Sequence, residues 1–191
     1  QDKQLAKVHW IRVLQGFSRP SSIQLAEPKD ISTEKSHEVV SVINEQDTTV
    51  IQAWARQHKL TLSAVVQGAW ALLLRAYGAG DDLVYGVTVS GRTPDLDGAD
   101  QMVGLFINTL PLRVRFSPDG DIEEWLQSIQ KQQTDMRQFE YSRLVDIQEW
   151  SDLRPGEALF DNIFVFENYP VDESLTHQTG LLQVRNVRYF E

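Results

Sequence analysis

The chain has 191 residues, of which 41% are hydrophobic and 24% are charged, and it carries a formal net charge of −9 at pH 7. A chain of this length and composition can bury a core, so we expect one folded domain or one lobe of a larger domain. The acidic balance without clustered Lys and Arg excludes nucleic-acid binding and binding to an anionic membrane surface, and the lack of cysteine excludes disulfides and thiolate metal sites.

The first 36 residues have the pattern of a connector. Apolar spacing predicts a short helix over residues 5–14, and the two prolines in residues 15–36 predict an irregular stretch. Loops of this length inside compact domains are usually functional or join lobes. We therefore predict a connecting helix and loop over residues 1–36 and a separate subdomain over residues 37–191.

A strand and two helices are expected next. The β-branched residues in 37–43 predict a strand. Asp47 is expected to cap one helix, and Thr61 to cap a second helix over residues 62–77. The second helix is apolar nearly all round, which predicts a central, buried position.

The middle of the chain predicts two strands joined by a loop. Residues 83–89 form a near-continuous apolar run, as expected for a strand covered on both faces. A turn-rich loop follows at 90–101, and a second strand is expected over 105–116. Pro111 cannot donate to a strand ladder, so that strand should be bent, bulged or at a sheet edge.

The remaining elements complete an α/β (α+β) pattern. The D-x-x-E motif at Asp121 predicts a helix over 121–138, followed by a short helix at 144–150. Two further strands are expected at 162–167 and 182–189. Together these elements predict a mixed sheet covered by helices.

The residues alone do not build a complete active site. The four histidines lack metal-ligand spacing, and surface or structural roles are expected for them: His9, His37, His58 and His177. A Ser/His/Asp triad assembles only in space and stays open, although no G-x-S-x-G elbow occurs. We expect no metal site and no catalytic residue in this chain.

Several motifs resemble one known family. Residues 90–94 read SGRTP and residues 102–113 read MVGLFINTLPLR. They resemble the SGR-x-P and VGxFxNTxPxR signatures of condensation domains in nonribosomal peptide synthetases. Residues 8–14, 141–148 and 159–170 are similar to other segments of that family, in the same order. The chain therefore resembles the second, C-terminal lobe of a condensation domain.

The resemblance implies a fold, a reaction and partners. The fold would be a chloramphenicol-acetyltransferase-like lobe that forms one wall of a tunnel. The reaction would join two thioester substrates, carried on phosphopantetheine by peptidyl carrier proteins, through an amide bond in secondary-metabolite biosynthesis. The expected partners are the N-terminal condensation lobe, the carrier proteins and an adjacent adenylation domain, with no cofactor bound directly, in the cytoplasm.

A missing motif limits what this lobe does alone. The family's catalytic HHxxxDG signature belongs to the first lobe, and this sequence contains no His-His pair. The resemblance therefore implies an inactive piece that needs its partner lobe. Two alternatives stay open, a non-catalytic module that docks carrier proteins and an ester-forming condensation relative.

The resemblance also assigns a candidate tunnel wall, made of Ser90, Gly91, Arg92, Asn108 and Thr109. Asn108 is expected to hydrogen-bond near the tunnel, either to substrate or to backbone groups of a bulged strand. Arg92 is expected to form an ion pair with a loop carboxylate such as Asp95 or Asp97, and a phosphopantetheine contact is the alternative. Residues near 168–181 are expected to cross to the first lobe and close the tunnel.

Overall fold

The computed structural model describes residues 2–23, 38–92, 98 and 101–167. Its elements in chain order are α1 (Lys3–Leu14), α2 (Glu45–Gln57), α3 (Leu62–Leu74), a π-helical turn (Arg75–Ala79), β1 (Asp82–Val89), β2 (Asn108–Arg115), α4 (Ile122–Met136), a 3₁₀ turn (Arg137–Phe139), α5 (Leu144–Glu149) and β3 (Ile163–Phe164). The predicted strand at 182–189 and the boundary between residues 36 and 37 lie outside the described residues.

A small mixed sheet lies at the centre of the fold, with strand order β2-β1-β3. β1 and β2 are antiparallel over eight residue pairs and end on the pair Val89–Asn108. β3 runs parallel to β1 and is short, pairing Gly86 with Ile163 and Val87 with Phe164. Pro111 lacks the amide hydrogen that a strand ladder needs, so its strand was expected to be bent, bulged or at a sheet edge. Among the described residues β2 is an edge strand, which agrees with the last of these alternatives.

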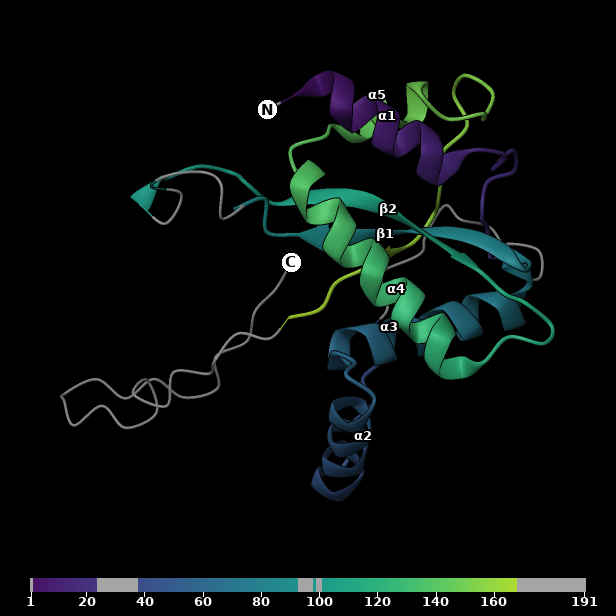
Figure 1. The fold of residues 1–191 in the computed structure, drawn as a ribbon, viewed down its shortest axis with the longest axis vertical. Coiled ribbons are helices and arrows are strands. Elements are labelled where there is room, and N and C mark those ends of the chain that lie inside the picture. Colours follow the sequence, from purple (N-terminus) through teal and green to yellow (C-terminus); the bar gives the residue numbers. More distant parts are fainter. Residues whose placement is uncertain (1, 24–37, 93–97, 99–100, 168–191) are drawn as a thin grey trace.

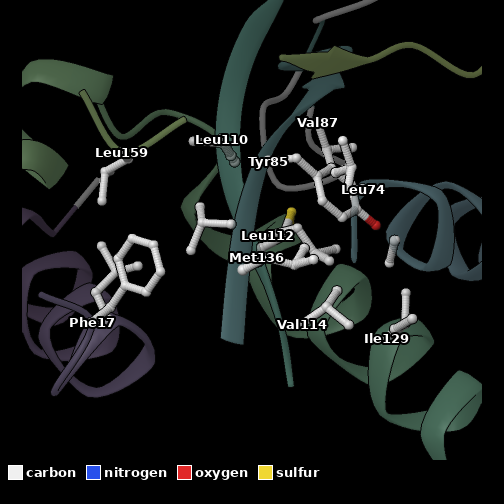
Figure 2. Packing of buried hydrophobic residues seen from close by; sticks show 14 of the residues in the cluster. Phe17, Leu74, Tyr85, Val87, Leu110, Leu112, Val114, Ile129, Met136 and Leu159 are labelled. Carbon is white, nitrogen blue, oxygen red and sulfur yellow. The ribbon is translucent and has the colours of Figure 1, made fainter. Parts of the chain in front are cut away.

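Helices cover both faces of the strand pair (Figure 1). α4 crosses one face together with α3, while α1 and α5 lie side by side beyond the other face. Figure 2 shows Phe17 and Leu159 on one side of the long strands and Leu74 and Ile129 on the other. Residues 83–87 are buried throughout, which confirms that this apolar run is a strand covered on both faces.

Two of the three predicted helix-capping residues cap their helices in the structure. The Thr61 hydroxyl accepts a hydrogen bond from the Ala64 amide, and the Asp121 carboxylate accepts from two amides at the start of α4. The prediction for α2 was wrong by one turn, because Asn44 is the capping residue. Asp47 instead lies inside the helix, where its own amide donates to the Asn44 side chain at 2.8 Å.

Three sequence predictions differ from the structure. Residues 38–43 are irregular and Val39 is 93% exposed, because no neighbouring strand among the described residues pairs with them. α3 is buried on one face only, since Leu72 and Leu73 on its outer face are 43% and 47% exposed. Residues 162–167 were predicted to be a buried strand, but only Ile163–Phe164 pair with β1, and Ile163 is 55% exposed.

Candidate functional site

The five residues that the sequence marked lie at one end of the strand pair. The last pair of the ladder joins Val89 to Asn108, so the chain leaves β1 into Ser90, Gly91 and Arg92 where it enters β2 at Asn108 and Thr109. Antiparallel pairing thus brings together two motifs that are separated in the sequence by a loop. We call residues 90–92 the post-β1 loop.

The Asn108 side chain is bonded to backbone groups. Its Nδ2 donates to the carbonyl oxygens of Glu140 and Ser142, each at 2.8 Å, and its Oδ1 accepts from the Thr109 amide at 2.9 Å. Asn108 was expected to bond either to substrate or to backbone groups, and the contacts that the structure shows are to backbone groups. Asn108 therefore fixes the turn at residues 139–142 against the start of β2.

Gly91 has a conformation that other residues reach only with strain. Its φ is +66°, and a Cβ built there would lie 1.8 Å from the carbonyl oxygen of Phe106. The Gly91 amide donates to the Glu140 carboxylate at 3.0 Å. A glycine at this position therefore lets the post-β1 loop pass directly against the segment that leads into β2.

Glu140 is a functional candidate that the sequence did not reveal. Burial raises the pKa of its carboxyl group, and the hydrogen bond from Gly91 and the charge of Arg137 oppose that rise in part. Glu140 lies in a turn without hydrophobic periodicity, so no pattern could have marked it. Only the packing of this turn against the post-β1 loop brings the carboxylate to Gly91.

Arg92 folds back onto the segment that precedes β2. Its guanidinium lies 4.3 Å from the centre of the Phe106 ring, and Nη2 donates to the carbonyl of Met102 at 3.1 Å. The ion pair predicted with Asp95 or Asp97 falls on residues outside the described part of the chain. The contacts that are seen tie the post-β1 loop to residues 102–106.

Three exposed aliphatic residues lead into β2. Val103, Leu105 and Ile107 lead into β2, and their exposed fractions are 103%, 91% and 60%. Three aliphatic side chains on five consecutive residues, all in water, are unfavourable unless another surface covers them. The site therefore combines a hydrogen-bonded loop with exposed aliphatic residues in the segment that precedes β2.

The described part of the chain contains neither a cluster of metal ligands nor a single membrane-spanning helix. No three His, Cys, Asp or Glu side chains within it gather as a metal ion would require. No single helix there has both the length and the apolar character needed to cross a membrane. The chemistry that this site can offer is positioning through backbone amides and the side chains of Asn108 and Arg92.

His9 has a structural environment that predicts a pH effect. The ring is buried and stacks on Phe139 at 4.2 Å, and burial, followed by the charge of Arg12, lowers its pKa to about 4. Between pH 6.5 and 4 the unfolded chain binds a proton that the folded chain does not. Stability should therefore fall across this window as the pH falls, by up to about 3 kcal/mol.

Urea unfolding of the wild type and of His9→Phe between pH 7.5 and 4.5 measures this effect. Phenylalanine keeps the stacked ring and cannot be protonated, so the variant should lose this part of the pH dependence. Equal slopes of unfolding free energy against pH in the two proteins would contradict the prediction.

Comparison with known proteins relates nearly the whole chain to one protein family. The sequence model described as "Condensation domain" matches residues 1–187. A linear gramicidin synthase protein from Brevibacillus parabrevis is 44% identical over 194 aligned residues, which cover 100% of this chain and 2% of that protein. Tyrocidine synthase 2 from the same organism is 35% identical over 175 residues, covering 92% of this chain and 5% of that protein.

The solved structures agree on the fold. A four-domain nonribosomal peptide synthetase bound to AMP and glycine superposes with a TM-score of 0.78 at 18% identity, over 97% of this chain and 14% of that chain. This likeness concerns the fold alone, and it confirms the predicted mixed α/β architecture. The chain spans only a few per cent of the length of the curated relatives named above.

Proposed function

Because the chain belongs to the condensation-domain family of nonribosomal peptide synthetases, we propose that it forms the C-terminal lobe of a condensation domain. Residues 37–191 are the C-terminal subdomain in this proposal, and residues 1–36 connect it to the first lobe. The observation that supports the assignment to this lobe is the order of the motifs at 90–94, 102–113, 141–148 and 159–170 in a sequence without a His-His pair.

The proposed reaction is acyl transfer with formation of an amide bond. The amine of an acceptor substrate attacks the carbonyl carbon of a donor thioester, the C–S bond breaks, and the thiol of the donor's phosphopantetheine arm is released. The amine proton must leave during this step, which calls for a base positioned at the reacting atoms. Since the sequence has no His-His pair, we assign that chemistry to an N-terminal lobe and expect this chain to be inactive alone.

The role proposed for this lobe is to form one wall of the substrate tunnel. Ser90, Gly91, Arg92, Asn108 and Thr109 would face the phosphopantetheine arm or the groups that hold its path. The exposed Val103, Leu105 and Ile107 beside them support a covering partner, because such a surface is stabilised when another lobe packs on it. The phosphopantetheine would come from carrier proteins, and an adenylation domain would be the neighbour in the synthetase, in the cytoplasm.

Mixing the two lobes tests this function. This chain and a separately expressed N-terminal condensation lobe would receive donor and acceptor loaded on carrier proteins, and amide product would be followed by mass spectrometry. We expect product from the mixture and from an intact two-lobe domain, and none from either lobe alone.

Two results would contradict the proposal. Product from this chain alone would show that the catalytic groups lie within it. An inactive mixture beside an active intact domain, with binding of carrier proteins retained by this chain, would favour the docking module instead.

A further inference from the structure

The turn at residues 139–142 is hydrogen-bonded to both parts of the candidate site. The Glu140 carboxylate accepts the Gly91 amide at 3.0 Å, while the carbonyl of the same residue accepts the Asn108 amide group at 2.8 Å. Glu140 therefore binds the residues after β1 with its side chain and the first residue of β2 with its backbone. The post-β1 loop and the start of β2 are linked through this residue.

The turn is itself anchored independently of the post-β1 loop. The Trp10 indole, buried in the core, donates from Nε1 to the Ser142 hydroxyl at 2.9 Å. The Ser142 amide donates to the Phe139 carbonyl at 2.9 Å, and the Tyr141 hydroxyl donates to the carbonyl of Asp2 at 2.9 Å. These contacts tie the turn to α1, so Glu140 presents its carboxylate from a fixed support.

The Gly91 amide needs such a support. Glycine has the widest choice of backbone conformations, so a loop centred on it loses more entropy on ordering than other loops. A side-chain oxygen held in a fixed place that accepts this hydrogen bond selects one conformation of the loop, whether that oxygen belongs to a carboxylate or to an amide. The close approach of Gly91 to the Phe106 carbonyl means that a small shift of the loop also moves the segment before β2.

We infer that Glu140 is a positioning residue for the transfer reaction, whose carboxylate holds Gly91 and thereby fixes the post-β1 loop in the tunnel wall. This inference rests on the proposed function. Glu140 does not need to touch the substrate, since it acts through the Gly91 amide. A misplacement of reacting groups by about 1 Å costs on the order of 10²-fold in rate, so an unanchored loop would be costly to the reaction.

The test uses the complete two-lobe condensation domain that contains this chain, with carrier-bound donor and acceptor. Glu140→Ala removes the acceptor, whereas Glu140→Gln keeps an oxygen that can accept the Gly91 amide. Glu149→Ala is the matched control, because Glu149 is an exposed carboxylate at the end of α5. Rates of amide formation, thermal midpoints and the ¹H–¹⁵N resonance of Gly91 are measured for all three variants.

We expect Glu140→Ala to lower kcat by about tenfold or more and to shift the Gly91 resonance, with a thermal midpoint close to that of the wild type. Glu140→Gln should retain most of the rate and the Gly91 resonance, and Glu149→Ala should match the wild type. Rescue by glutamine separates positioning from a merely structural role.

Other results would overturn the inference. If Glu140→Ala keeps the wild-type rate, or if Glu140→Gln loses as much rate as Glu140→Ala, the carboxylate does not act as the acceptor that positions the loop. A wild-type domain that forms no amide would instead contradict the proposed function, which separates the two failures.

Discussion

Replacing Arg113 by alanine is expected to lower the free energy of unfolding by about 2–4 kcal/mol, because it removes a buried donor from several acceptors at once. The Arg113 side chain is only 5% exposed and forms a two-point contact with the Asp82 carboxylate, at 2.7 Å from each of Nε and Nη2. Its Nη1 donates to the carbonyls of Val13 and Gln15 at the end of α1, at 3.0 and 2.8 Å. Alanine would leave these acceptors without their donor and open a cavity above Phe17.

Arg115→Ala is the control for this prediction. Arg115 lies two residues along the same strand and reaches the same Asp82 carboxylate at 3.6 Å, but its side chain is 61% exposed. An exposed pair of this kind contributes at most about 1 kcal/mol. Urea unfolding, followed by tryptophan fluorescence, measures the stability of both variants. Equal losses of unfolding free energy would show that the buried Arg113 guanidinium contributes no more than the exposed Arg115.

The pH dependence of the Arg113 variant follows from Asp82. Burial alone raises the pKa of this carboxyl, but hydrogen bonding and attraction from Arg113, and then Arg115, outweigh burial, so the pKa lies below its ordinary value of 3.8. The carboxylate therefore adds stability above pH 3.8 that is lost as the pH falls further through the folded-state pKa. The stability difference between wild type and Arg113→Ala should narrow below about pH 4.

The second large effect is expected at Gly91. Gly91→Ala puts a Cβ 1.8 Å from the Phe106 carbonyl oxygen, in a backbone region of positive φ. A clash with backbone is not relieved by a change of side-chain rotamer, so the post-β1 loop must leave its position. In the intact condensation domain we expect a fall in kcat on the order of 10²-fold.

Gly16→Ala is the control that separates the effect of the clash with Phe106 from the effect of placing alanine at a positive φ. Gly16 has a φ of +74°, close to that of Gly91, but a Cβ there would meet no atom within 4 Å. The control should cost about 1 kcal/mol of stability and leave amide formation unchanged. If Gly91→Ala behaves like Gly16→Ala in both measurements, close approach to Phe106 is not needed for the reaction.

Local signals were enough to predict several elements. Thr61 and Asp121 cap their helices as expected, because an N-cap needs only one side chain and the next two or three amides. The buried strand at 83–89 was also correct, since an apolar run of that length has few other places in a fold.

Local sequence signals did not predict which segments pair as strands or which residues hold the candidate site in place. Residues 38–43 have strand composition and no strand partner among the described residues, because composition does not supply a neighbour. The resemblance marked Gly91 and Asn108, yet Glu140, which bonds to both, carries no sequence signal.

The sequence by itself determined the family, the caps of α3 and α4 and the central strands, because each depends on residues adjacent along the chain or on a motif read in order. Only the tertiary structure decided that the turn at 139–142 bonds to Gly91 and Asn108 in the candidate site and that Arg113 joins α1 to the sheet. These contacts join residues about 30 to 100 positions apart. Their formation depends on how helices and strands pack, which no local pattern specifies.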